Sequence, residues 1–166
     1  MIQQHLRRPT AMPYGTNLHL FQMGIKPVWE DEAFTNGCHI SIKAQKYQTS
    51  KYWEDLLLAM LGEQFTDENV VVGMVLKLRP MYDRIDIWMR DSTDAKAVAN
   101  AKSDVARMIQ VPESELEFEV FKEIQQKDAE KKKHFNNKAT GFKKFSKDQK
   151  NEEGGLKRPT KAEEEK

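Results

Sequence analysis

The spacing of apolar residues changes several times along the chain. Five stretches alternate between apolar and polar residues or are rich in β-branched residues, and both patterns predict β-strands. In one of them, Ile40 and Ile42 fall on one face and His39 and Ser41 on the other, as in a half-buried antiparallel strand. Two of the strands are separated by only four residues, so we expect a hairpin there. The predicted strands cover residues 17–23, 38–44, 70–79, 84–89 and 116–124.

Two other stretches repeat their apolar residues at helical spacing. The first predicts an amphipathic helix that is capped by Ser50 and stops at Gly62. The second predicts a helix over residues 93–109, with Ser92 or Thr93 as its N-cap. Strands and helices together indicate an α+β domain with an antiparallel sheet. The predicted buried stripe of the first helix consists of Trp53, Leu56, Leu57, Met60 and Leu61.

Charge is divided unevenly along the 166 residues. Residues 1–125 carry 14 basic and 18 acidic side chains, whereas residues 126–166 carry 13 basic and 8 acidic ones. The second segment has almost no aliphatic residues, so we expect one domain over residues 1–125 followed by a charged, mostly disordered tail. Cys38 is the only cysteine, which excludes an intrachain disulfide and a cysteine-based zinc site.

No apolar run is long enough for a signal peptide or a membrane span. We therefore expect a cytoplasmic protein without a membrane partner. The basic pair at residues 157–158 leaves nuclear import open as an addition to the cytoplasmic location.

An aromatic residue followed by acids stands in a predicted loop. Trp29 precedes Glu30, Asp31 and Glu32, and Pro27 disfavours regular structure just before it. An exposed indole beside carboxylates suits a flat, cationic ligand that donates hydrogen bonds, because the ring attracts the cation and the carboxylate accepts the donors. On composition alone, an anchor that packs the loop explains Trp29 equally well.

A second set of candidate residues lies on the predicted hairpin. Period-two geometry places Arg84, Asp86 and Trp88 on one face of their strand, and Arg79 lies across the hairpin from Arg84. Two guanidiniums beside an indole suit a phosphate attached to a flat ring. The alternative is an ordinary sheet tryptophan with two solvated arginines. No nucleophile, acid-base pair or metal-ligand spacing accompanies them, so we expect no catalysis and no cofactor, and a nucleotide-acting enzyme is the weakest alternative.

These residues resemble the cap-binding translation initiation factor 4E family. The resemblance runs from about Ile2 to Val120 and rests on residues 29–32, on the helix with Trp53 and on residues 73–88. It implies a non-enzymatic, RNA-binding factor that recognises the 7-methylguanosine 5′ cap of messenger RNA. In the roles it implies, Trp29 stacks on the methylated base, Glu30 accepts its hydrogen bonds, Trp88 lies at the N7-methyl group, and Arg79 and Arg84 hold the triphosphate.

The resemblance also implies how the domain is built and what it contacts. It implies a curved sheet with helices on the convex face and the ligand slot on the concave side. It further implies that a scaffold or repressor protein binds the exposed face of the first helix through a short helical motif. The residues implied in that contact are Asp55, Leu58, Gly62 and Glu63.

The chain departs from the family at its start. The family's N-terminal strand, which carries the second stacking tryptophan, and its first partner-binding helix have no counterpart before Ile2. We expect a fragment of a longer chain, and a shortened member that stacks its base on one side, or on Tyr14 or Phe34, is the alternative. His39 and Ile40 also differ from the family's basic and aromatic residues. A relative with an incomplete cap pocket, regulating translation through protein contacts alone, is the alternative function.

Overall fold

The computed structural model describes residues 8–67 and 69–127. The chain divides into two compact units, Met1–Gln125 and Gln126–Lys166. The predicted disorder of the tail falls mostly on residues outside the described ranges and stays a prediction. The five strands and the two long helices described below belong to the first unit.

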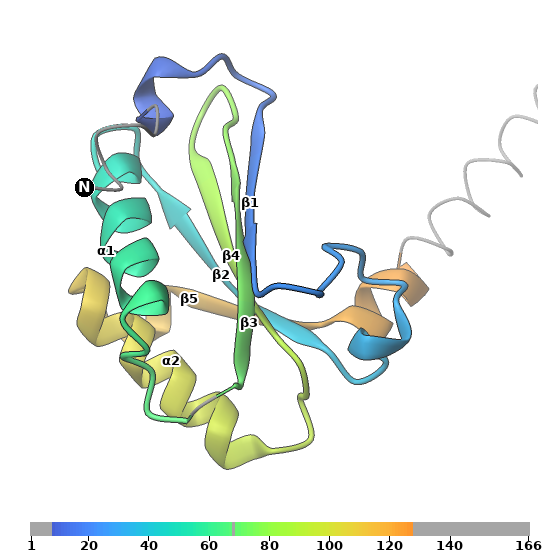
Figure 1. Ribbon diagram of the computed structural model, residues 1–166. Helices are drawn as coiled ribbons and strands as arrows, with labels where there is room; N and C mark the ends of the chain where they lie inside the picture. The colour runs from blue at the N-terminus through green and yellow to red at the C-terminus, as the bar shows by residue number, and fades with distance from the viewer. Residues whose placement is uncertain (1–7, 68, 128–166) are drawn as a thin grey trace, which may run out of the picture. The chain divides into compact units, whose positions relative to one another are not determined.

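Five antiparallel strands form one sheet with the order β1-β3-β4-β2-β5 (Figure 1). Strand β4 lies at the centre, where it pairs with β3 through the predicted hairpin and with β2 on its other side. The predicted α+β class with an antiparallel sheet is confirmed. The strands are β1 (Asn17–Phe21), β2 (Cys38–Ala44), β3 (Val71–Lys77), β4 (Asp83–Met89) and β5 (Leu116–Val120).

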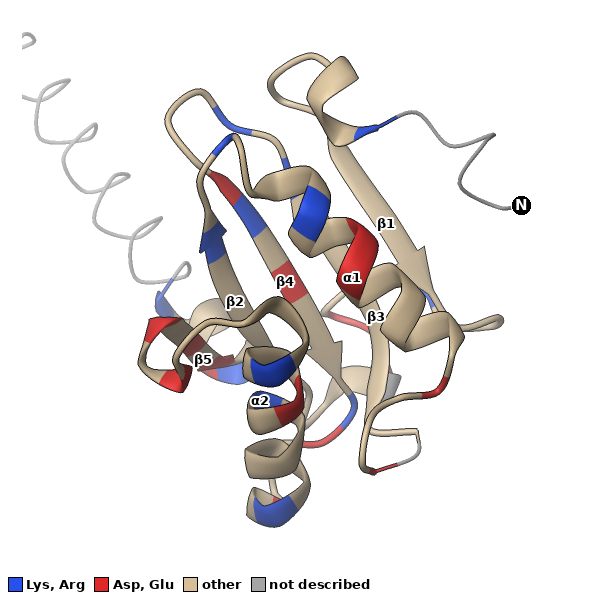
Figure 2. Cartoon of the chain, turned by 90° about the vertical axis from the view of Figure 1, so that its left-hand side faces the viewer, with Lys and Arg blue, Asp and Glu red and all other residues tan. Residues whose placement is uncertain are grey.

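Two helices, α1 (Thr49–Leu61) and α2 (Ala95–Ile109), cover the same face of this sheet (Figures 1 and 2). We call it the helix face, and the opposite side the open face. Strand residues of one parity point into the helix face, as period-two geometry predicts. Burying side chains of this size stabilises the fold by about 1.5–3 kcal/mol each. Fully buried residues there include Ile40, Leu56, Met74, Ile85, Ile87 and Ile109.

The predicted stripe of α1 is correct except at its last residue. Leu61 is 52% exposed, whereas Leu56 is 1% exposed. At about 100° per residue, Leu61 lies roughly 140° around the helix from Leu56, so it points away from the sheet. The helix also starts differently, because Thr49 is its first residue and Gln48 is an N-cap without a side-chain hydrogen bond. Ser50 is therefore not the cap.

Other boundaries also differ from the predicted ones, since β1 ends at Phe21 and not at residue 23, and β3 covers Val71–Lys77 and not 70–79. Asp94 caps α2 by accepting a hydrogen bond from the Ala97 N–H at 3.0 Å, one residue beyond the predicted caps. Strand β5 ends at Val120, and a helix begins at residue 121, although alternation continues to Ile124. Short 3-10 helices lie at Pro9–Ala11, Glu32–Phe34 and Glu113–Glu115.

Candidate functional site

One end of the open face is covered by a second hydrophobic cluster. It forms where the loop of residues 22–37 and the helix that begins at residue 121 meet the sheet. We call it the aromatic cluster, because three of its five buried members are aromatic. It consists of Phe34, Val72, Val75, Trp88 and Phe121, with Phe21, Ile25, Trp29 and Ile124 packed against them.

Trp88 lies at the centre of the aromatic cluster and is only 9% exposed. Its ring meets those of Phe21 and Phe34 edge to face, with centroids 5.3 and 5.2 Å away, and that of Phe121 at 4.6 Å. Such aromatic pairs add about 0.5–1.5 kcal/mol each beyond their buried area. The indole Nε1 has no hydrogen-bond partner among the described residues. The packing role considered for Trp88 in the sequence analysis is therefore present, and only a small part of its surface is open to a ligand.

A glycine makes this packing possible. Phe21 lies opposite Gly73 in the β1–β3 register, and a Cβ at Gly73 would come within 2.3 Å of the Phe21 ring. Only a residue without a side chain lets the ring lie against the strand at this distance. The Phe21 ring is thereby held beside Trp88.

Trp29 is half-buried and packs against the aromatic cluster. Trp29 and Trp88 therefore belong to one cluster, and the loop-packing role left open for Trp29 is present together with partial exposure of its ring. Gln125 Nε2 donates to the Trp29 carbonyl at 3.5 Å. The neighbouring Glu30 is exposed, and its carboxylate has no hydrogen bond or ion pair within residues 8–67 and 69–127. An indole that is partly open to solvent thus stands next to an unengaged carboxylate.

Neither aromatic residue named as a substitute for a second stacking ring is placed for that role. Phe34 is 2% exposed, and Trp88 and Phe121 pack against its ring. Tyr14 is exposed, but the Lys46 ammonium lies 4.6 Å from its ring centroid. Lys46 in turn pairs with Asp83. In this arrangement, neither Phe34 nor Tyr14 is a stacking partner for a base on Trp29.

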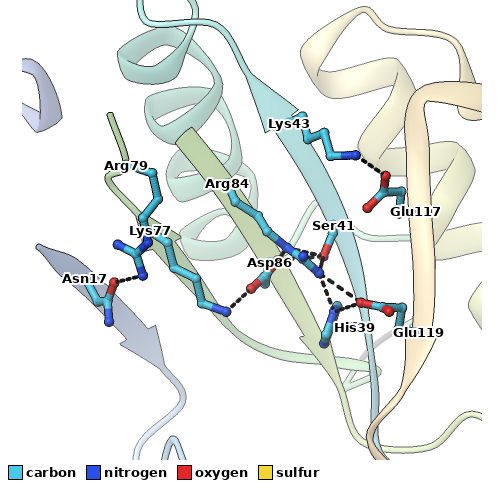
Figure 3. A network of polar contacts seen from close by, with 10 residues as sticks. All are labelled: Asn17, His39, Ser41, Lys43, Lys77, Arg79, Arg84, Asp86, Glu117 and Glu119. Atoms are coloured by element: carbon cyan, nitrogen blue, oxygen red, sulfur yellow. Dashed lines mark hydrogen bonds and ion pairs between the residues drawn. The ribbon is translucent and has the colours of Figure 1, made fainter. Parts of the chain in front are cut away.

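The other end of the open face carries a network of polar and charged side chains (Figure 3). Arg84 is at its centre. Its Nε donates to Asp86 Oδ1 at 2.7 Å, and its Nη2 donates to Ser41 Oγ at 2.7 Å and to Glu119 Oε2 at 3.0 Å. We call these residues, together with His39 and Lys77, the open-face charge network. The network joins strands β2, β3, β4 and β5.

Asp86 is the buried anion of this network. Its side chain is fully buried, and Lys77 Nζ lies 2.6 Å from Oδ2 while Ser41 Oγ donates to Oδ1 at 2.6 Å. Burial acts to raise the pKa of Asp86, but Lys77, Ser41 and Arg84 outweigh it and hold the pKa below its usual range. Asp86 is therefore ionised and fixes the positions of the two cations around it.

His39 is the second buried titratable group of the open-face charge network. Arg84 Nη2 lies 3.1 Å from His39 Nε2, and because a guanidinium can only donate, this nitrogen accepts the hydrogen bond. Burial is the largest cause of a lowered pKa for His39, although the carboxylates of Asp86 and Glu119 act against it. His39 is thus a neutral acceptor for Arg84.

The two arginines predicted to hold phosphates lie on the open face but point in different directions. Arg79 Nη2 donates to Asn17 Oδ1 on β1 at 3.0 Å, whereas Arg84 reaches across β2 toward β5 (Figure 3). Lys77 lies between them. The prediction that Arg79 lies across the hairpin from Arg84 is wrong, because β3 ends at Lys77 and Lys77 is the residue that pairs with Arg84. Sequence reasoning missed Lys77. The structure therefore brings Lys77 to this region in addition to the two predicted arginines.

Sequence reasoning also missed the carboxylates of β5. Glu117 and Glu119 have the parity of the open face, and they pair with Lys43 and Arg84 respectively. Their position could be read only after the β2–β5 pairing was known. The cations of this face are therefore partly neutralised by acids from the last strand.

The residues implied in partner binding lie at the exposed side of α1 and just beyond its end. Leu58 is 50% exposed, and Leu61 beside it adds a second exposed apolar side chain. Asp55 pairs with Lys51 at 2.6 Å. Gly62 ends the helix, its N–H donating to the Leu58 carbonyl, and Glu63 follows with a left-handed φ of 52°.

The model of the eukaryotic initiation factor 4E family matches residues 1–138 of this sequence. The chain belongs to that family. Among the relatives it resembles are the translation initiation factor NCBP of Arabidopsis thaliana, 39% identical over 108 residues, and initiation factor 4E-4 of Caenorhabditis elegans, 34% identical over 113 residues. These alignments cover 65% and 68% of this chain but 49% and 53% of the relatives. The chain thus spans about half the length of these curated relatives.

Solved structures of initiation factor 4E proteins share this fold. The C. elegans eIF4E-3 complex with the 4E-binding protein Mextli and a cap analog superposes with a TM-score of 0.71 at 28% identity, covering 75% of this chain and 73% of the other. Ascaris suum eIF4E-3 with an m2,2,7G cap superposes with a TM-score of 0.66 at 29% identity, covering 72% and 69%. The family resemblance and the predicted fold are both confirmed.

The initiation factor 4E family is one of translation factors and not of enzymes, in line with the expectation of no catalysis. Within the described part of the chain, no three His, Cys, Asp or Glu side chains are grouped to hold a metal ion. Over the same residues, no helix has the length and apolar character needed to cross a membrane.

Proposed function

We propose that this domain binds the 7-methylguanosine 5′ cap of messenger RNA and acts in translation initiation. The observation that carries the proposal is that the partly open indole of Trp29 and the unengaged carboxylate of Glu30 stand beside Trp88, on the face that also presents Arg79 and Arg84. Cap-bound structures of family members with the same fold support it.

The base is recognised at Trp29 and Glu30. Methylation at N7 makes the purine cationic, and a cation over an indole face gains about 0.5–2 kcal/mol beyond ordinary stacking. Glu30 accepts the N1–H and the exocyclic amine as a bidentate pair. Trp88 lies near the N7-methyl group in this proposal, with only 9% of its surface exposed.

The phosphates are held by the cations of the open face. Among the described residues, the Arg79 guanidinium donates to neutral oxygens only, those of Asn17 and the Leu78 carbonyl, so it keeps its charge available to an anion. Arg84 and Lys77 already face Asp86. We expect Arg79 to make the stronger contribution to phosphate affinity for this reason.

A scaffold or repressor protein binds α1 in this proposal. Exposed apolar side chains at i and i+3, here Leu58 and Leu61, suit one face of a short amphipathic helix. The C. elegans eIF4E-3 structures with Mextli support a protein partner of this kind. Glu54, half-buried on the same helix, pairs weakly with Arg8 at 3.9 Å and adds a charge at the edge of this surface.

One observation favours the alternative function, in which the domain acts through protein contacts alone. Arg84 is held by Asp86 and Glu119 before any ligand is present, so a cap would have to compete for it. In either case we propose a cytoplasmic location, with the nucleus as an additional one.

Quenching of tryptophan fluorescence by 7-methyl-GTP tests the proposal. We expect saturable quenching, with GTP binding at least tenfold more weakly because it lacks the positive charge on the base. Trp29→Ala removes the stacking surface and should weaken 7-methyl-GTP binding by about 1–3 kcal/mol, or roughly 5- to 150-fold. Absence of saturable quenching in the unaltered protein would favour the alternative function.

A matched pair of acidic substitutions separates base recognition from general charge. Glu30→Ala should weaken binding of 7-methyl-GTP, while Glu32→Ala, an exposed acid two residues further on, should leave it unchanged. Circular dichroism and the melting temperature check that both variants are folded. Equal effects of the two substitutions would remove Glu30 from the site.

A further inference from the structure

Arg84 is bound by two carboxylates that differ in how firmly they are held. Asp86 is fully buried and is also held by Lys77 and Ser41. If Asp86 moved away, the Lys77 ammonium would lose its ion pair and the Ser41 hydroxyl would lose its hydrogen-bond acceptor. The Glu119 side chain is 33% exposed, and among the described residues its carboxylate forms ion pairs only with Arg84 and His39. Glu119 is therefore the displaceable member of the pair.

The Glu119 carboxylate occupies a position that suits a ligand anion. Its Oε2 lies 3.0 Å from Arg84 Nη2, the distance of a charge-assisted hydrogen bond. A phosphate oxygen that binds the same nitrogen needs the same approach and carries the same sign of charge. Carboxylate and phosphate cannot both take this donor without repulsion, so binding of one opposes binding of the other.

The backbone keeps Glu119 at this position in the fold. It lies opposite His39 in the β2–β5 register, and His39 lies opposite Trp88 in the β2–β4 register. The carboxylate therefore stands on the open face, two strands from the ring at the centre of the aromatic cluster. A shorter or neutral side chain at residue 119 would leave Arg84 with Asp86 alone as its anionic partner.

We propose that Glu119 is a specificity-determining residue that competes with the ligand's phosphates for Arg84, so that it lowers the affinity for a polyphosphate chain without changing recognition of the base. This inference rests on the proposed cap-binding function for its ligand class. It predicts that the domain gains less affinity from each added phosphate than its number of cations suggests.

Isothermal titration calorimetry on the full chain tests the competition. Three probes are used: 7-methyl-GTP, 7-methylguanosine without phosphate, and inorganic tripolyphosphate. Glu119→Gln keeps the size of the side chain and removes its charge, and it should tighten binding of 7-methyl-GTP and of tripolyphosphate by about three- to tenfold. Binding of 7-methylguanosine should not change.

Glu117→Gln is the matched control, because Glu117 has the same strand and the same face but pairs with Lys43. It should change tripolyphosphate binding by less than twofold. Glu119→Ala is a second variant in case Glu119→Gln is unstable, and melting temperatures show whether each variant is folded.

The outcomes separate this inference from the proposed function. If 7-methyl-GTP binds the unaltered protein and Glu119→Gln does not tighten it, the competition is wrong and cap binding stands. If tripolyphosphate binding tightens in Glu119→Gln but no variant binds the methylated base, the competition stands and cap binding fails. Equal tightening in Glu117→Gln indicates a general field effect and overturns the assignment to Glu119. Failure of every variant to bind tripolyphosphate or 7-methyl-GTP overturns both.

Discussion

The seven residues of strand β4 point alternately to two faces of the sheet, and the two faces differ in their surroundings and in their roles. Toward the helices, Ile85, Ile87 and Met89 are at most 1% exposed and belong to the hydrophobic core. Toward the open face, Arg84 lies among charged side chains and Trp88 among aromatic rings. Because the two sets differ only in parity, stability and ligand binding can be altered separately by choosing odd or even positions of one strand.

The open face is stable only because its polar groups are paired. A buried carboxylate costs several kcal/mol unless cations and hydrogen bonds compensate it. Asp86 receives that compensation from Lys77, Arg84 and Ser41. On the helix side of β4 the one such group is Asp83, at the start of the strand, which pairs with Lys46 and Thr49. At the apolar positions of the helix face a change acts through volume, whereas a change on the open face acts through charge.

The largest expected effect is on the helix face. Ile87→Ala removes a side chain that is 1% exposed at the centre of the sheet, and we expect it to lower the free energy of unfolding by about 2–5 kcal/mol. Urea unfolding followed by circular dichroism measures this change. At temperatures where the variant is folded, its affinity for 7-methyl-GTP should equal that of the unaltered protein. A loss of affinity as large as that of Trp29→Ala would show that the two faces are coupled.

A smaller effect is expected at Gly73, on the open face. Gly73→Ala places a Cβ within 2.3 Å of the Phe21 ring, so the ring or the strand must move. We expect a loss of about 1–3 kcal/mol in the free energy of unfolding, typical of overpacking. Thermal and urea unfolding measure it.

A double-mutant cycle isolates the contact between Gly73 and Phe21. Phe21→Leu removes the ring that the new Cβ would meet, so the cost of Gly73→Ala should be smaller in that background. The same cost in both backgrounds would place the strain elsewhere in β3.

Local periodicity predicted much of this molecule because parity is a property of neighbouring residues. The faces of β2 and β4 and the burial of Trp53 follow from spacings of two and of three to four residues. The same reasoning failed at two places. Leu61 was predicted to be buried but is exposed, and the last strand was predicted to continue past Phe121 but ends at Val120. The chain leaves the strand at Phe121, whose N–H donates to the Gly37 carbonyl and whose ring packs on Phe34.

The candidate site was predictable only in part for the same reason. Trp29, Glu30 and Arg84 could be named from sequence, but the partner of Arg84 could not, because Glu119 lies 35 residues away on a strand whose neighbour is β2 and not β4. The aromatic cluster beneath Trp29 was likewise hidden, since its members come from five separate segments. The residue types of the site could be read from the sequence, but the pairing of strands that are far apart in the sequence could not.

Two lysines on the open face sharpen the comparison between buried and exposed charge. Lys77→Gln removes one of the cations that compensate the buried Asp86, and we expect it to lower the free energy of unfolding by about 1–2 kcal/mol. Lys43→Gln removes the same charge from a pair in which both side chains are about half exposed, and it should leave stability unchanged within error. Urea unfolding of the two variants at pH 7 makes the comparison, and an equal loss in both would show that burial of Asp86 is not the deciding factor.

The smallest expected effect depends on pH and arises at His39. Its folded-state pKa is lowered, chiefly by burial, so between that value and its ordinary value of about 6.5 the unfolded chain binds more protons than the folded one. Stability is therefore lost as pH falls below about 6.5. Burial acts to raise the pKa values of Asp86 and Glu119, but their cationic partners outweigh it and lower both, so those groups lose their contribution only at more acidic pH.

His39→Gln keeps an acceptor for Arg84 and cannot take up a proton, so its free energy of unfolding should stay nearly constant between pH 7 and pH 5, where that of the unaltered protein declines. His19→Gln is the control, because His19 is exposed on β1 and has no place in the charge network. Urea unfolding at half-unit steps of pH gives both profiles. A decline of the same size in His39→Gln would assign the acid sensitivity to other groups, and would make the open face less dependent on its buried histidine than its contacts indicate.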